Sequence, residues 1–121
     1  MKVNMKEMKL DSKVIDSVKK EVVNEVRKEM KMDLKKIVLY GSCARGDFTE
    51  DSDIDIALLT ECDRAEVKKY ADTLAKIATD FAMKYFVIVN FVCLPIQEFD
   101  EKKNWYPYFH NIMTEGECLY G

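Results

Sequence analysis

The chain of 121 residues is poor in the side chains that bind soft metals or build disulfide frameworks. It has a single histidine, His110, and its four cysteines lie far apart without a Cys-x-x-Cys pair. This spacing does not match the usual structural zinc sites, and free thiols in a reducing compartment are its simplest explanation. Because no carboxylate partner for His110 is evident, we interpret it as an ordinary helix residue rather than as a catalytic base.

Long apolar runs and one-sided charge are also absent. The longest apolar run, 85–95, is interrupted by Asn90 and is too short to cross a bilayer. Residues 1–10 alternate lysine and methionine without the apolar centre of a signal peptide. The net charge is −3, and the lysine pairs lie near acidic residues, so no basic stripe for long nucleic acids emerges. We therefore expect a cytoplasmic protein with no membrane partner and no extended nucleic-acid surface.

Glycine is scarce, with four residues in the chain, and Gly41 stands at the end of an apolar run. The run 37–40 is too short for a helix and suits a buried strand that Gly41 ends. Without a Cβ atom, Gly41 lets a triphosphate approach the backbone closely. Ser42 adds a hydroxyl donor at what should be the first turn of a short helix, where free N–H groups favour anions. The pattern predicts a phosphate-binding turn.

Ten residues separate Ser42 from Asp53, which with Asp55 opens a second apolar strand predicted over 53–59. Since side chains alternate along a strand, Asp53 and Asp55 share one face while Ile54 and Ile56 face the core. Two carboxylates on one face, with no histidine or cysteine beside them, form an oxygen site suited to Mg²⁺ bridging to phosphate oxygens.

Gly41-Ser42, this spacer and Asp53-Ile54-Asp55 together resemble the signature of the nucleotidyltransferase superfamily of DNA polymerase β. Ala44-Arg45-Gly46 and Ser52 also fit the pattern. A strand-loop-strand without a site is the alternative interpretation. In length, the chain is most similar to the minimal nucleotidyltransferases of prokaryotes, which are often encoded beside a helical partner with ribonuclease activity. We accordingly expect one minimal nucleotidyltransferase domain over residues 1–121.

The resemblance implies Mg²⁺-dependent transfer of AMP from ATP to an acceptor hydroxyl. The acceptor it suggests is a tyrosine of a HEPN-type toxin, which the protein would silence as an antitoxin. Asp53 and Asp55 would be the catalytic residues and the metal ligands, and the nucleotide would be held by Gly41, Ser42 and Arg45. For Arg45 the residues themselves leave two roles open, because it could bind the triphosphate or pair with Asp47 or Asp51 across the loop.

The family pattern usually has a third carboxylate on the next core strand, and Asn90 stands at the best-matching position. An amide oxygen can ligate a metal, but it brings no negative charge and accepts no proton. Glu98, which follows that strand, could supply the third carboxylate if its side chain reaches the site. Otherwise it is an exposed acidic residue on a polar turn. The departure keeps an alternative function open, in which a catalytically weak nucleotide-binding module neutralises a partner by docking on it.

The remaining pattern predicts an α/β fold, a small sheet with helices packed on one face. Val14, Val18, Val22, Val26 and Met30 mark a helix capped by Asp11 or Ser12, and Asp63 with Glu66 opens another. A third strand is expected over 86–94, a short helix or turn over 95–103, and a last helix over 104–115 closed by Gly116. That the sheet is mixed is implied only by the resemblance.

From its length we expect the chain to lack the additional domains that hold the acceptor in larger relatives. The acceptor must therefore be held by a shallow surface of this chain, by a second copy in a homo-oligomer, or by another protein. Near the C-terminus, the aromatic residues Trp105, Tyr106, Tyr108 and Phe109 cluster in the sequence. Core packing is the default interpretation of this cluster, and a partner-facing patch is the alternative.

Overall fold

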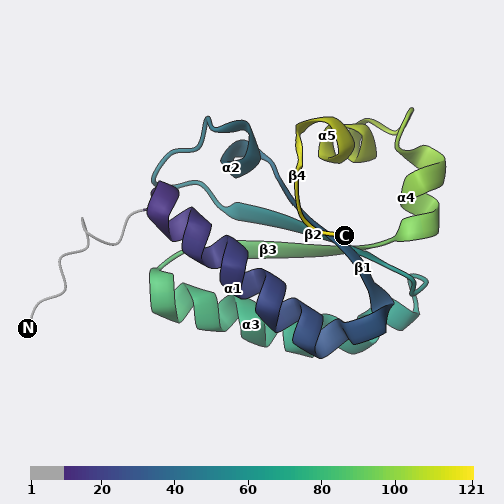
Figure 1. Ribbon diagram of the computed structural model, residues 1–121, viewed down its shortest axis with the longest axis horizontal. Helices are drawn as coiled ribbons and strands as arrows, with labels where there is room; N and C mark the ends of the chain where they lie inside the picture. The colour runs from purple at the N-terminus through teal and green to yellow at the C-terminus, as the bar shows by residue number, and fades with distance from the viewer. Residues whose placement is uncertain (1–9) are drawn as a thin grey trace, which may run out of the picture.

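The computed structural model describes residues 10–121 and contains a four-stranded mixed sheet with helices on both of its faces (Figure 1). The strand order is β3-β2-β1-β4; β1 runs antiparallel to β2 and β4, and β2 runs parallel to β3. The strands are β1 (Leu34–Tyr40), β2 (Ile54–Thr60), β3 (Val89–Pro95) and β4 (Glu117–Tyr120). The helices are α1 (Ser12–Met30), α2 (Ser42–Arg45), α3 (Ala71–Tyr85), α4 (Ile96–Lys102) and α5 (Pro107–Glu115), with 3₁₀ turns η2 (Lys31–Asp33) and η3 (Glu66–Tyr70). The predicted α/β class and the mixed sheet are confirmed.

The first helix forms as its valine spacing predicts. The Asp11 side chain accepts a hydrogen bond from the Val14 backbone N–H at 2.9 Å and thereby caps α1. The buried stripe consists of Ile15, Val18, Val22, Val26 and Met30. Ile15 is thus its first member in place of Val14, which is only partly buried.

The helix signal at Asp63 and Glu66 is also confirmed. The Glu66 N–H donates to Asp63 Oδ1 at 2.8 Å and the Asp63 N–H donates to Glu66 Oε1 at 3.3 Å, a reciprocal capping box. The chain passes through η3 into α3, which buries Leu74, Ile77 and Phe81. Ala71 and Ala82 of this helix are exposed.

Helices α1 and α3 lie along one face of the sheet, where the main core forms (Figure 1). The sheet residues in this core are Ile37, Leu39, Ile54, Ile56 and Leu58. The expectation of helices on one face is incomplete, however. A second, smaller core on the opposite face joins α4 and α5 to the sheet through Val38, Ala57, Leu59, Leu94, Phe99, Phe109 and Ile112. The reason is that β1 and β2 are apolar on both faces, so both faces need cover.

The short strand β4 was not predicted. It follows Gly116, the predicted end of the last helix, and pairs with β1 through Leu39–Glu117 and Val38–Cys118. A Cβ atom on Gly116 would clash with the Ile112 carbonyl oxygen and with the Val38 side chain. The tight passage from α5 to β4 therefore depends on the missing side chain at this position.

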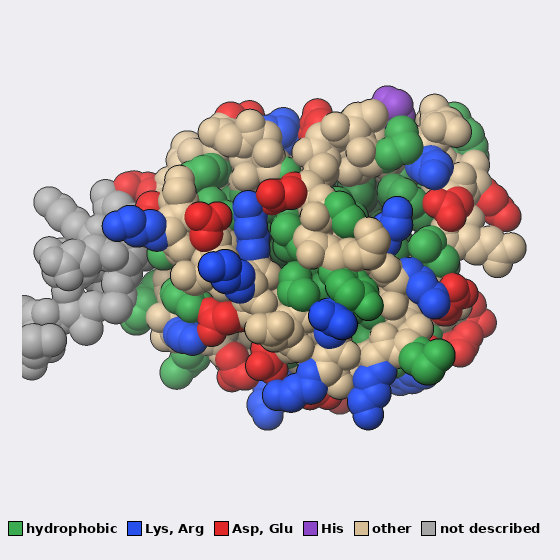
Figure 2. Space-filling model, viewed as in Figure 1, with side chains coloured by type: hydrophobic (Ala, Val, Ile, Leu, Met, Phe, Trp, Pro, Cys, Tyr) green, Lys and Arg blue, Asp and Glu red, His purple; other side chains and the backbone are tan. Residues whose placement is uncertain are grey.

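On the face seen in Figure 2, lysine and arginine side chains are interspersed with aspartate and glutamate. Between residues 10 and 121, no helix is long and apolar enough to cross a membrane.

Candidate functional site

Three polar side chains form a row across the sheet. Asp55 on β2 pairs with Tyr40 on β1 and with Asn90 on β3. Residues directly opposite one another on neighbouring strands point to the same face. Helices α4 and α5 cover the opposite end of the same sheet face, where they pack on Val38 and Ala57. The row therefore lies beyond the small core, at the end of the sheet where β2 and β3 begin.

Asp53, Asp55 and Asn90 are in contact. The Asn90 amide nitrogen donates to Asp53 Oδ2 at 3.1 Å and to Asp55 Oδ1 at 3.2 Å. The structure thus places both carboxylates on one face, as the alternation predicts, although Asp53 immediately precedes β2. One amide group bridges two negative charges that would otherwise repel each other at short range.

Gly41 supports this cluster through its backbone. Its φ of +75° is a conformation that residues with a side chain rarely adopt, and a Cβ atom there would lie 2.6 Å from Asp55 Oδ2. The strand β1 ends at Tyr40, and α2 begins at Ser42, so Gly41 makes the turn between them. The sequence predicts that the missing side chain of Gly41 gives a triphosphate access to the backbone. In the structure it also leaves room for the Asp55 carboxylate.

Cys43 lies in α2 beneath the same turn. It is buried, and its thiol donates to the backbone carbonyl of Asp53 at 3.4 Å. Burial, followed by the charge of Asp55, raises the pKa of the Cys43 thiol above its ordinary value. A thiol kept protonated is a poor nucleophile.

Arg45, the last residue of α2, forms ion pairs with two exposed carboxylates. Its Nε lies 3.2 Å from Asp47 Oδ2, and its Nη1 lies 3.2 Å from Glu115 Oε2 at the end of α5. The pair with Asp47 is one of the two roles left open by the sequence. Glu115 is seventy residues away in the chain, and no sequence signal pointed to it.

Tyr40 and Tyr108 join the sheet to α5 beside the carboxylates. Their hydroxyl oxygens lie 2.8 Å apart, and their rings meet edge to face with centroids 6.0 Å apart. Burial, followed by the hydrogen bond with Tyr108, raises the pKa of the Tyr40 hydroxyl above its ordinary value. Sequence reasoning missed both residues as neighbours of the site, although Tyr40 immediately precedes Gly41.

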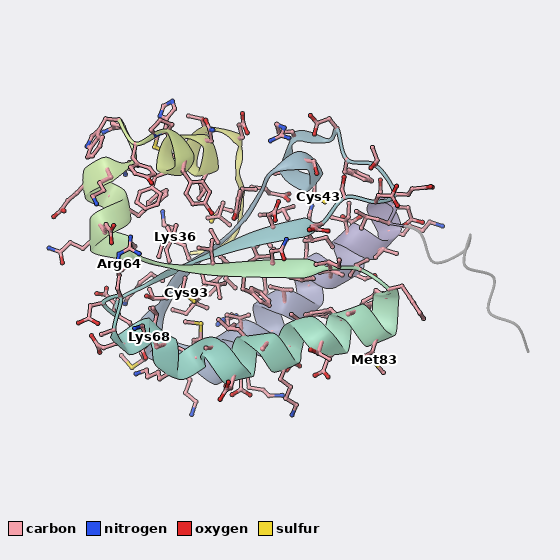
Figure 3. All side chains as sticks on the ribbon, turned by 180° about the vertical axis from the view of Figure 1, so that it is seen from behind. Lys36, Cys43, Arg64, Lys68, Met83 and Cys93 are labelled. Carbon is pink, nitrogen blue, oxygen red and sulfur yellow. The ribbon has the colours of Figure 1, made fainter. Side chains whose placement is uncertain are left out.

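Glu98 lies at the opposite end of the sheet from Asn90. It belongs to α4, which follows the last residue of β3, whereas Asn90 is the second residue of β3. Its carboxylate accepts from Arg64 Nε at 2.9 Å and pairs with Lys102 at 3.1 Å, and Arg64 and then Lys102 lower the pKa of Glu98. Figure 3 shows Arg64 far from Cys43 of α2. Glu98 is therefore not a substitute for the third carboxylate.

The donor set suits a hard cation. Within residues 10–121 there is no group of three histidine, cysteine, aspartate or glutamate side chains that could hold a metal alone. Mg²⁺ is commonly bound by one or two carboxylates together with substrate phosphates and water. The pair Asp53 and Asp55 fits this pattern, and the Gly41 turn is adjacent to it.

Comparisons with known proteins agree with this arrangement. Residues 19–111 match the model of the nucleotidyltransferase domain family. Two proteins of Methanocaldococcus jannaschii, each carrying the name "putative protein adenylyltransferase", are similar in sequence. One is 37% identical over 101 residues, covering 84% of this chain and 93% of that protein. The other is 31% identical over 74 residues, covering 58% of this chain and 73% of that protein.

Solved structures share the fold at lower identity. A chain of a toxin–antitoxin complex with AMP-PNP superposes with a TM-score of 0.57 at 22% identity, covering 85% of this chain and 73% of that chain. A chain from the complex of a tri-AMPylated Shewanella oneidensis HEPN toxin with an MNT antitoxin superposes with a TM-score of 0.53 at 20% identity, covering 88% and 71%. With the family model matched over most of its length, the chain belongs to the nucleotidyltransferase family of enzymes, as its motifs predicted.

Proposed function

We propose that the protein transfers AMP from Mg²⁺-ATP to a hydroxyl group of a partner protein. The observation that carries the proposal is the bridging of Asp53 and Asp55 by the Asn90 amide, with Asp55 beside the Gly41 turn. The names of the two Methanocaldococcus relatives and the AMP-PNP present in a neighbouring toxin–antitoxin structure support adenylyl transfer. ATP-dependent chemistry of this kind is also consistent with the expected cytoplasmic location.

Asp53 and Asp55 would hold Mg²⁺, which when bound supplies positive charge to the phosphate oxygens. Gly41 and Ser42 would hold the triphosphate, and Arg45 would bind it after exchanging one of its present carboxylate partners. The acceptor oxygen would attack the α-phosphorus and lose its proton to water, while the bond from that phosphorus to the pyrophosphate oxygen breaks and pyrophosphate leaves with the electron pair. We place the acceptor beside β3, because this strand forms the edge of the sheet and Asn90 on it is exposed.

The acceptor we propose is a tyrosine hydroxyl of a HEPN-type partner, and the biological role is that of an antitoxin. The structural neighbour in complex with a tri-AMPylated HEPN toxin supports this choice. We also keep open that a second copy of the chain helps to hold the acceptor.

A second candidate function is favoured by Asn90. An amide accepts no proton from the attacking hydroxyl, and here its N–H groups face both carboxylates. Binding of nucleotide and partner without rapid transfer would give a module that neutralises its partner by docking alone.

The two functions are separated by incubating the protein with labelled ATP, Mg²⁺ and the proposed HEPN-type partner. We expect label on a partner tyrosine, and we expect none with the Asp53→Asn/Asp55→Asn variant. Calorimetry of the same variant should show that Mg²⁺-dependent ATP binding is lost while the circular dichroism spectrum is unchanged. Neutralisation of the partner by both proteins without label would establish the docking module. Unchanged Mg²⁺-ATP affinity in the double variant would overturn the proposed site.

A further inference from the structure

Strand β3 has one open edge. In the sheet order β3-β2-β1-β4 it is hydrogen-bonded to β2 alone among the strands of residues 10–121. The Ile54 N–H of β2 donates to the Ile88 carbonyl oxygen at 2.8 Å, which fixes the phase of the parallel ladder between these two strands. Successive residues of a strand direct their backbone groups to opposite sides, so every second residue from Ile88 onward faces β2. The residues between them direct their N–H and C=O groups to the open edge: Val89, Phe91 and Cys93.

An apolar groove of about 520 Å³ lies under this edge, between β3 and α3. Residues 89–93 of β3 form one wall. The other wall is formed on α3 by Ala71, Leu74, Ala75 and Ala78. Helix α3 runs alongside β3, and Cys93 lies between them (Figure 3). Because the alanine side chains are small, the groove has room for side chains from another chain.

Asn90 joins this groove to the candidate site. Its side chain donates to Asp53 and Asp55, and the same residue belongs to the groove wall. A chain that pairs with the open edge therefore passes directly beside the two carboxylates. The backbone donors and acceptors of the edge repeat at strand spacing, and an extended peptide is the ligand whose backbone matches them. A helix uses its own backbone groups internally and cannot pair with this row.

We propose that the partner segment carrying the acceptor hydroxyl binds in extended form, as an added strand along β3. The inference rests on the proposed function and specifies how its acceptor is held. Side chains alternate along a strand, so the acceptor side chain lies on the same sheet face as Asn90, and its two neighbours lie on the face of α3, as Val89 does. The groove receives these two neighbours, which should be apolar to match its walls.

The position of the added strand selects tyrosine as the acceptor residue. Two strand spacings, about 10 Å, separate the added backbone from that of β2, which carries Asp55. A serine hydroxyl stays close to its own backbone and does not cross this distance. A tyrosine ring spans the intervening strand and carries its hydroxyl over Asn90 toward the carboxylates. The recognised segment is thus a tyrosine between two apolar residues.

The first test is transfer of labelled adenylate from Mg²⁺-ATP to synthetic peptides by the full chain. The reference is the end-blocked peptide Lys-Thr-Val-Tyr-Val-Thr-Lys; in two further peptides, aspartate replaces both valines or serine replaces the tyrosine. We expect label on the reference tyrosine and none on the serine peptide. Aspartate at the flanks should lower kcat/KM at least about tenfold, since burial of an apolar side chain contributes about that factor.

Backbone methylation distinguishes an added strand from other modes of binding. In the reference peptide, a single N-methyl group is placed on the tyrosine or on the valine that follows it. Successive N–H groups of an added strand point alternately to β3 and away from it. One of the two methyl groups should therefore lower kcat/KM about tenfold, because it removes a hydrogen bond and holds the strands apart, while the other should have little effect.

Ala75→Glu tests the groove in the protein itself. A carboxylate on this wall should raise KM for the reference peptide about tenfold, with kcat and the calorimetric affinity for Mg²⁺-ATP unchanged. Ala82→Glu is the matched control. It places the same side chain at an exposed position of the same helix, outside the groove, and should change none of these values.

Equal transfer to the valine- and aspartate-flanked peptides or to the serine peptide, equal effects of the two methyl groups, or an unchanged KM in Ala75→Glu would each overturn the added strand. Label on the HEPN-type partner but on none of the peptides would overturn it as well and leave the proposed function standing. Label on neither the partner nor the peptides would mean that the proposed function fails, and the added strand with it.

Discussion

Asn90 is the parallel-strand partner of Asp55, and its amide nitrogen lies 3.2 Å from Asp55 Oδ1 and 3.1 Å from Asp53 Oδ2. The position that would carry a third carboxylate therefore holds a hydrogen-bond donor. In the absence of a metal this donor holds the two charges together. In the proposed reaction, this amide would not accept the proton of the acceptor hydroxyl.

Asn90→Asp should change stability and turnover in opposite ways. Without Mg²⁺, the variant loses the two hydrogen bonds that Asn90 donates, and its new carboxylate repels Asp53 and Asp55. The melting temperature should therefore fall below that of the wild type. With Mg²⁺ that loss should be reversed. Transfer to the partner should become faster, by up to about a hundredfold if the new carboxylate accepts the acceptor's proton. The gain should appear mainly in kcat, because the added charge matters most as the transition state forms.

These effects are measured by thermal melts in EDTA and in Mg²⁺, and by the rate of labelled adenylate transfer. Asn104→Asp, at an exposed position between α4 and α5, adds the same charge and is the control for altered net charge. A variant that melts as the wild type does in both conditions would show that Asn90 does not bridge the carboxylates in solution. A folded variant that transfers no faster would show that the wild-type site works with two carboxylates.

Gly41→Ala should disrupt the metal site more than Gly46→Ala. Both glycines have positive φ, so each alanine is strained by about 1–2 kcal/mol. The Cβ atom at position 41 would in addition press on Asp55 Oδ2, whereas nothing lies within 4 Å of a Cβ atom at position 46. We expect Mg²⁺-ATP binding to be weakened at least about tenfold in Gly41→Ala and little in Gly46→Ala, since a displaced ligand costs about a charged hydrogen bond. Equal affinities of the two variants by calorimetry would contradict the contact with Asp55.

Cys43 should be alkylated slowly, and only as the pH is raised. Burial and the charge of Asp55 keep its pKa above the ordinary value, so little thiolate is present near neutral pH. Cys118 is exposed and serves as the internal control. Bound Mg²⁺-ATP should slow the reaction of Cys43 further, because α2 then opens less often. Mass spectrometry of labelled peptides measures both thiols, and equal rates for Cys43 and Cys118 without ligand would contradict the buried position.

Glu21 should contribute to acid sensitivity. Its carboxylate on α1 accepts from Lys84 and Tyr85 on α3, and these bonds lower its pKa below 4.5. A lowered pKa gives stability that is present above 4.5 and is lost as the pH falls through the folded-state value. Glu21→Gln should therefore be less stable than the wild type at pH 7, with the difference shrinking toward pH 3. Urea denaturation at both pH values measures it, and a difference independent of pH would rule out the ion pair as the cause.

Local physics explains what could be predicted from the sequence. The four-residue spacing of valines predicts one buried face for α1. Asp63 and Glu66, three positions apart, form the capping box that precedes α3. Alternation along β2 places Asp53 and Asp55 together once one face is buried. These are short-range rules, so the α/β class, the motif and the candidate metal ligands followed from the order of residues alone.

Tertiary packing decided the rest. Glu98 follows Asn90 by only eight positions, yet the length of β3 carries it to the other end of the sheet, where Arg64 and Lys102 engage it. β4 is too short to be recognised by periodicity and exists because it pairs with β1. The contact of Tyr108 with Tyr40 spans sixty-eight residues and depends on α5 folding back over the second face of the sheet. The sequence by itself determined the carboxylate pair and its turn, while only packing over long distances decided which helix stands beside them, because no local preference encodes that contact.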